Sequence, residues 1–181
     1  MKKWKRRIVS VFLIGFVGII LILPMDVSAQ SSLDLYKKAR KIELFKTTKK
    51  EINELLKGAE VLVIKDKSGG FEEVIYNFEE GKLRIVYSTG KCVERCEKSG
   101  YDVESSYVIE YSLHLFKPLK ISEVGIDFSK LTKTKYTEGN YVIYSNENKG
   151  IEITGGEEEV TSFNFSPSAK QEKKYSCETI K

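Results

Sequence analysis

Apolar residues change their spacing along the segment 47–64, from a helical period to an extended run. Ile52, Leu55 and Leu56 are three and four positions apart, so they fall on one side of a helix. The β-branched and aliphatic run Val61–Ile64 that follows favours a strand. We expect a short helix that leads directly into a strand, with later strands forming a sheet that covers the helix.

Both ends of this helix carry sequence signals. Thr48 and Glu51 have the spacing of a capping box, in which each side chain bonds the backbone amide of the other. Gly58 stands where helices commonly end in a left-handed residue. The helix is therefore predicted over 49–57.

An amphipathic segment over 32–42, before this helix, predicts a first helix with Ser32 as its N-cap. After the second helix, apolar and polar residues mostly alternate, as they do in half-buried strands. The predicted strands, with the segment 89–106 as the longest loop between them, cover 71–78, 83–88, 107–116, 141–145, 150–154 and 160–165. The pattern predicts an α+β fold, two short N-terminal helices packed on an antiparallel β-sheet.

The first 29 residues have the layout of a secretory signal peptide. A basic start precedes the apolar run Ile8–Met25, and the helix-breaking Pro24 precedes a small-residue cleavage site that ends at Ala29. We expect cleavage there, leaving a single domain over 30–181 with a loosely ordered tail at 170–181. The alternative is that residues 8–25 are retained as a membrane anchor, because the run is just long enough to span a bilayer.

The charge balance changes once this segment is set aside. Residues 1–29 hold five of the 30 Lys and Arg side chains and one of the 26 Asp and Glu side chains, which leaves 25 of each and a net charge of zero. A nucleic-acid partner requires a surplus of basic groups to neutralise phosphates. We therefore expect no nucleic-acid partner.

Three cysteines are present, at positions 92, 96 and 177, and export would permit one disulfide. The residues leave all three pairings open: Cys92–Cys96, Cys92–Cys177 and Cys96–Cys177. A structural zinc site needs about four Cys or His ligands, and only His114 could complete the set. We expect no metal and no cofactor.

Acid-base chemistry near neutral pH would depend on His114 or on carboxylates such as Asp102 and Glu104. His114 lies in a predicted strand without an evident partner, so we interpret it as a solvated residue. No catalytic residue is assigned.

Tyrosines are dense in the second half of the chain, and an aromatic ring with a polar end suits a protein interface. They also suit the half-exposed face of an antiparallel sheet, and we favour this explanation because one face of such a sheet is commonly solvated. The candidates for an interface are Tyr107, Tyr111, Tyr141 and Tyr144.

The segment 42–58, IELFKTTKKEINELLKG, resembles the first helix of the small outer-membrane-assembly lipoproteins of the SmpA/BamE type. This resemblance implies a two-layer arrangement of two helices on a sheet. The chain differs from these lipoproteins because no Cys follows its apolar N-terminal run.

A second resemblance rests on the stretches VIEYS at 108–112, LKISE at 119–123, YVIYSNENKGIEI at 141–153 and FSPSAK at 165–170. Together they are similar to a family of exported proteins from Acidobacteria-type soil bacteria, over about Ile42–Cys177. The family has no assigned activity. The similarity implies a Cys92–Cys177 disulfide, with Cys96 as a departure from the pattern.

These observations predict a secreted or periplasmic, non-enzymatic domain that binds a protein or another envelope component. Two alternatives stay open. One is an exported enzyme that uses carboxylates or His114, and the other is a membrane-tethered form that retains residues 8–25.

Overall fold

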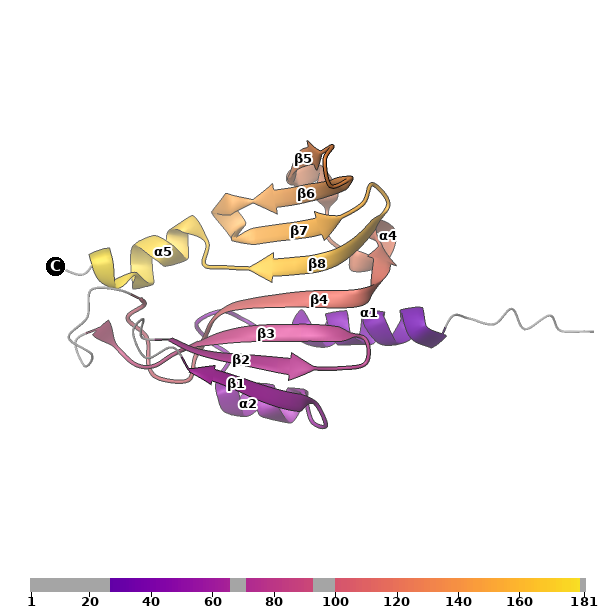
Figure 1. Ribbon diagram of the computed structural model, residues 1–181. Coiled ribbons are helices and arrows are strands. Elements are labelled where there is room, and N and C mark those ends of the chain that lie inside the picture. The colour runs from indigo at the N-terminus through magenta and orange to yellow at the C-terminus, as the bar shows by residue number, and fades with distance from the viewer. Residues whose placement is uncertain (1–26, 66–70, 93–99, 180–181) are drawn as a thin grey trace, which may run out of the picture.

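Eight antiparallel strands form one continuous sheet in the computed structural model, which describes residues 27–65, 71–92 and 100–179 (Figure 1). The strand order is β1-β2-β3-β4-β8-β7-β6-β5, so two four-stranded meanders join where β4 pairs with β8. The bounds are β1 (Glu60–Lys65), β2 (Phe71–Asn77), β3 (Gly81–Ser88), β4 (Val108–Lys120), β5 (Thr132–Tyr136), β6 (Tyr141–Asn146), β7 (Ile151–Gly155) and β8 (Glu159–Phe165).

The helices are short and lie mainly against one face and one end of this sheet. They are α1 (Val27–Ala39), α2 (Lys49–Leu55), α4 (Ile121–Val124) and α5 (Ala169–Tyr175), with 3-10 turns at Phe128–Lys130 (η1), Glu147–Lys149 (η2) and Cys177–Thr179 (η3). Helix α1 packs on β3 and β4, and α2 lies on the same face, near β1 and β2 (Figure 1). No helix of the described residues is both long and apolar enough to cross a membrane.

The core lies between α1 and the inner face of the sheet. Leu83, Leu113 and Phe163 oppose one another on β3, β4 and β8 and are fully buried, which continues one apolar row across the junction of the two meanders. From the helix, Tyr36 packs on Phe163 with ring centroids 4.7 Å apart. Its hydroxyl donates to the backbone carbonyl of Val124, so the buried phenol is satisfied.

The outer face of the sheet is largely polar. Arg84 on β3 bonds Glu73 on β2 at 2.7 Å and Glu110 on β4 at 2.6 Å, which makes a charged row across three strands. His114 lies on this face too, because it alternates with the buried Leu113 and Leu115 along β4.

The predicted SmpA/BamE-like two-layer arrangement is wrong. The structure has one large eight-stranded sheet with a few short helices, so two helices on a small sheet do not describe it. The sheet is wide because β4 pairs with β8, a strand far from it in the sequence. Local periodicity does not encode such a pairing. Strand β5 also lacks a pattern of buried residues, since all five of its residues are exposed.

Several local predictions are confirmed. Thr48 and Glu51 form the capping box of α2, and Gly58 has the positive φ of 89° expected after the helix. The two hairpins β2–β3 and β6–β7 lie where the sequence places them. Ser32 is a different case, because α1 already begins at Val27 and Ser32 is buried within it rather than capping it.

The predicted signal peptide and the alternative anchor, residues 8–25, lie outside the described residues. Within the segment predicted as a loosely ordered tail, the structure places α5 and the disulfide between Cys92 and Cys177. The pairing implied by the resemblance is thus present, and Cys96 lies outside the described part of the chain.

Candidate functional site

The connector between α1 and α2 forms the first wall of a cleft at one end of the inner sheet face. Its backbone is tied to the start of β4, because the amide of Phe45 donates to Val108 at 2.7 Å and the amide of Val108 donates to Thr47 at 2.9 Å. Phe45 itself has a φ of 62°. The connector is therefore held against the sheet, and its side chains Arg40 to Lys46 project from a fixed backbone.

The turn between β6 and β7 forms the second wall. Asn146 accepts a bond from the amide of Lys149 at 3.1 Å and so caps the η2 turn. Gly150 follows with a φ of 63°, and its carbonyl accepts from the amide of Ser166 at 2.9 Å. This turn presents Lys149 toward the cleft.

Helix α5 forms the third wall, and both of its ends are stabilised. Ser168 and Gln171 make its capping box, with the Gln171 side chain accepting from the Ser168 amide at 2.9 Å. After the helix, Cys177 is bonded to Cys92, and the Cys177 amide donates to Gly100 at 2.9 Å. The C-terminal helix is thereby pinned beside the sheet end.

An aromatic cluster packs under this attachment. Phe45 stacks on Tyr175 of α5 with ring centroids 4.5 Å apart and meets Tyr101 edge-on at 5.4 Å. The Tyr101 hydroxyl donates to Glu172, and burial raises the pKa of that phenol. The connector and α5 are thus joined by ring contacts as well as by the covalent link.

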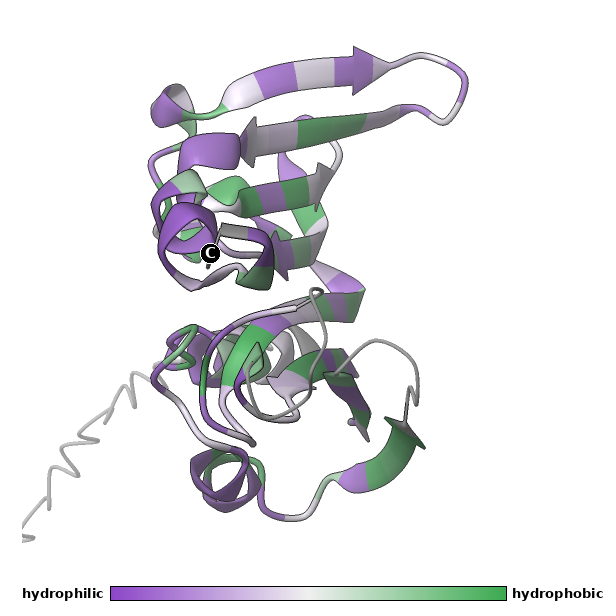
Figure 2. Ribbon diagram, turned by 90° about the vertical axis from the view of Figure 1, so that its left-hand side faces the viewer, coloured by the Kyte–Doolittle hydropathy of each residue, from purple (hydrophilic) through white to green (hydrophobic). Residues whose placement is uncertain are grey.

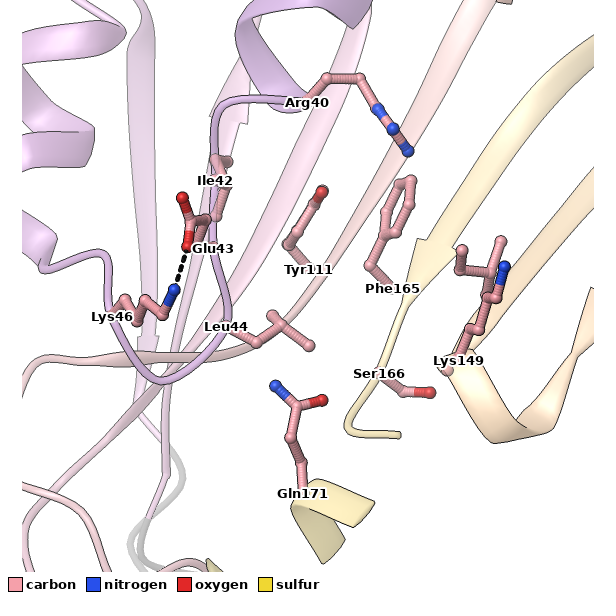
Figure 3. A pocket seen from close by; sticks show the side chains of 12 residues that line it. Arg40, Ile42, Glu43, Leu44, Lys46, Tyr111, Lys149, Phe165, Ser166 and Gln171 are labelled. Carbon is pink, nitrogen blue, oxygen red and sulfur yellow. Dashed lines mark hydrogen bonds and ion pairs between the residues drawn. The ribbon is translucent and has the colours of Figure 1, made fainter. Parts of the chain in front are cut away.

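The floor of the cleft is aromatic. Tyr111 on β4 and Phe165 on β8 stack with ring centroids 4.6 Å apart, and both are buried. The Arg40 guanidinium lies 5.6 Å from the Phe165 ring centre, within the range of a cation–π contact. Figure 3 shows Arg40 reaching over Phe165, with Lys149 and Gln171 on the other sides of the opening. Burial raises the pKa of the Tyr111 phenol, so this group stays neutral.

Two adjoining hollows of about 350 and 500 Å³ make up this site, and we call them together the basic cleft. They share four lining residues, Leu44, Lys46, Lys149 and Gln171. The other residues used below are Arg40, Glu43, Tyr111, Ile151, Phe165, Ser166, Lys170, Lys174 and Tyr175.

Cations greatly outnumber carboxylates around the basic cleft. Among the described residues that line it, Arg40, Lys46, Lys149, Lys170 and Lys174 are basic and Glu43 alone is acidic. Glu43 is already paired with Lys46 at 2.6 Å, and this hydrogen bond raises the pKa of Lys46. Within the described residues, Arg40, Lys149 and Lys170 have no carboxylate partner. The site therefore suits an anion that also carries apolar or aromatic groups.

The predicted interface tyrosines do not gather in one place. Tyr111 is in the floor of the basic cleft, whereas Tyr144 packs edge-on against Phe128 at 4.9 Å. Tyr141 stacks on Tyr136 at 4.9 Å near the far edge of the sheet. Tyr107 forms an isolated antiparallel β-bridge with Thr48, at the start of α2.

The candidate acid-base residues are also separated. Asp102 accepts from the amide of Cys92 at 3.2 Å, and Glu104 pairs with Lys91 at 2.5 Å. His114 is six residues into β4, about 20 Å along the strand from its start. No group of three or more metal-ligating side chains occurs in the described parts of the chain.

Sequence reasoning missed the cations of the basic cleft. Arg40, Lys149 and Lys170 come from three segments, each of which reads as an ordinary charged surface. Only the sheet order brings them together, because β8 lies between β4 and β7 and so places the η2 turn and α5 beside the connector.

Comparison with known proteins adds no relative. No family model, no curated protein and no solved structure matches this chain.

Proposed function

We propose that this chain is an exported, non-catalytic binding domain, and that the basic cleft binds an acidic segment of a secreted or envelope protein. The observation that carries the proposal is the set of cations Arg40, Lys149 and Lys170 around the stacked Tyr111–Phe165 floor, without carboxylate partners in the described residues. Charged groups left unpaired around an apolar floor are suited to electrostatic recognition of an anionic partner.

The composition of the walls favours a peptide over a simple anionic polymer. Leu44 and Ile151 supply apolar contacts, while Gln171 and Ser166 supply hydrogen-bonding groups. A polymer of phosphates would use the cations but not the apolar walls. A peptide that alternates acidic with aliphatic or aromatic side chains would use both.

Export is supported by the Cys92–Cys177 disulfide, because such bonds form and persist in oxidising compartments. A binding role is supported by the way the cleft is held. Its three walls are tied by backbone bonds, a capping box and the disulfide, and a preorganised site loses less entropy when a ligand binds.

Charge reversal at the cleft tests the proposal. The probe is a fluorescein-labelled peptide in which Asp alternates with Leu and Phe, and its affinity is measured by fluorescence anisotropy. The double variant Arg40→Glu/Lys149→Glu is expected to weaken binding by at least about tenfold, since two attractions become repulsions. Binding of the unaltered protein should also weaken with added salt.

The matched control reverses the same number of charges elsewhere. Lys57, just after α2, and Lys82, at the start of β3, are exposed and do not line the basic cleft. Lys57→Glu/Lys82→Glu is expected to leave the affinity within about twofold, because exposed charges remote from the ligand are screened. An equal loss in both double variants would mean that only net charge matters, which contradicts the proposal.

A second assay searches for the natural partner. The tagged protein and its Arg40→Glu/Lys149→Glu variant are cross-linked in envelope fractions of the native host. A protein captured by the first bait and not by the second supports the proposal. Tighter binding of inorganic polyphosphate than of the peptide would contradict it and indicate an anionic polymer instead.

A further inference from the structure

Strand β1 leaves an apolar edge of the sheet exposed. Val61, Leu62, Val63 and Ile64 are 49%, 54%, 45% and 44% exposed, and they are consecutive. The strand pairs with β2 along all six of its residues, and no strand of the described chain pairs with its other edge. Figure 2 shows β1 as a green strand at the lower end of the molecule.

The opposite edge of the same sheet is built differently. Strand β5 places Lys133 and Lys135 on the face that carries the core residues Tyr144 and Val142 of β6. Both lysines pair with Glu157. Inward-facing charges of this kind prevent an edge strand from pairing with another chain. β1 carries no such charge between Glu60 and Lys65, so only one of the two edges is protected.

The exposed side chains of β1 point to both faces of the sheet. Val61 and Val63 oppose the buried Tyr76 and Val74 of β2, whereas Leu62 opposes Ile75 on the outer face. A helix or a flat protein surface that packs on one face of β1 would leave the apolar side chains of the other face exposed to water. An added strand covers both faces and also satisfies the free backbone groups of the edge.

The sequence of β1 is suited to pairing with its own copy. A two-fold axis through an antiparallel pair requires residues equally distant from the axis to oppose each other. With the axis at Leu62, this residue opposes Leu62 of the second copy, and Val61 opposes Val63. The run Val-Leu-Val reads the same in both directions, so apolar side chains meet on both faces.

The charges in this register permit the pairing as well. Glu60 opposes Ile64 of the second copy, and no two like charges within the strand oppose each other. Residues 30–181 carry 25 basic and 25 acidic side chains, so two copies have no net repulsion. Like charges directly opposite would have disfavoured a symmetric pair.

We propose that two copies of this chain associate through β1, antiparallel and centred on Leu62, and extend the sheet from one molecule into the next. A single strand pair buries less surface than the interfaces of tight complexes. The dimer is therefore expected to form in the micromolar range and to exchange with monomer. It lies at the opposite side of the sheet from β5. It leaves the basic cleft open, because none of the described side chains of β1 lines that cleft.

The test measures mass in solution with the full chain expressed in an exporting bacterium and purified from it. Sedimentation equilibrium over a series from low micromolar to near-millimolar protein is expected to show a monomer–dimer equilibrium. Leu62→Lys places a charge from each copy at the axis and is expected to raise the dissociation constant at least about tenfold. Phe116→Lys is the control, because Phe116 is equally exposed, at 53%, on the outer face of β4.

A cysteine trap tests the register. In a background with Cys96→Ser, Leu62→Cys is expected to form an intermolecular disulfide under mild oxidation, because opposed residues bring their Cβ atoms within reach of one. Glu60→Cys serves as the control, since Glu60 opposes Ile64 and not its own copy. The proposal is overturned if the unaltered protein stays monomeric throughout the concentration series. It is also overturned if the Leu62→Lys variant associates as tightly as the unaltered protein. Association into aggregates of undefined size overturns it too.

Discussion

At the scale of single residues, Gly150 decides the shape of one cleft wall. Its φ of 63° is in the left-handed region, and a side chain at this position would overlap the carbonyl oxygen of Ser166. Only glycine combines that backbone conformation with this close approach. The turn that presents Lys149 therefore depends on the absence of a Cβ atom.

Gly150→Ala is expected to lower the free energy of unfolding by at least about 2 kcal/mol, from left-handed strain together with backbone overlap. Gly58→Ala is the matched control, because Gly58 also has a positive φ, of 89°, but its Cβ would meet nothing within 4 Å. This variant should lose only about 1 kcal/mol of stability, from the left-handed strain alone. Urea unfolding of both variants measures the difference, and equal losses would show that the Ser166 contact has no effect.

At the scale of elements, α5 depends on attachments outside itself. None of its residues is buried, so its own side chains add little to the core. A helix of seven residues is also too short to be stable alone. The disulfide joins residues 85 apart in the sequence and holds the end of this helix beside the sheet.

Cys92→Ser/Cys177→Ser is expected to lower the free energy of unfolding by about 4 kcal/mol, because a long closed loop restricts the unfolded chain strongly. The double variant should also bind the peptide probe more weakly, since α5 carries Lys170 and Gln171 of the basic cleft. Thermal unfolding and anisotropy measure the two effects. Cys96→Ser is the control and should change neither; a loss there equal to that of the double variant would contradict the Cys92–Cys177 pairing.

At the scale of the whole molecule, β4 joins the two meanders into one continuous sheet. It pairs with β3 on one side and β8 on the other, and one core cluster extends from Ile52 on α2 to Tyr144 on β6. Leu113 is fully buried at the centre of this arrangement. Loss of packing there should therefore affect both halves of the sheet together.

Leu113→Ala is expected to lower the free energy of unfolding by about 3 kcal/mol, through the lost apolar contacts and the cavity that remains. Unfolding should stay a single transition by far-UV and near-UV circular dichroism. Ser112→Ala, on the outer face beside it, should cost about 0.5 kcal/mol or less. Two separated transitions in the Leu113 variant would show that the meanders unfold independently.

Local elements followed from the sequence because their causes are local. The capping box of α2 needs only Thr48 and Glu51, and alternation predicted β2, β3 and most of β4. Strand β5 gave no such signal, because it has no alternating apolar residues and all five of its residues are exposed. The start of α1 was misplaced since Ser32 has the chemistry of a cap but is buried inside the helix.

What the sequence by itself determined is the capped helix α2, the β2–β3 and β6–β7 hairpins and most of β4, since short-range periodicity and side-chain chemistry are enough to specify them. The tertiary structure alone decided the pairing of β4 with β8, and with it the eight-stranded sheet and the basic cleft. Arg40 is more than a hundred positions before Lys149 and Lys170 in the sequence. The three side chains come together only through that pairing. The physical reason is that strand order follows from the burial of whole faces, which depends on all segments at once and not on any one of them.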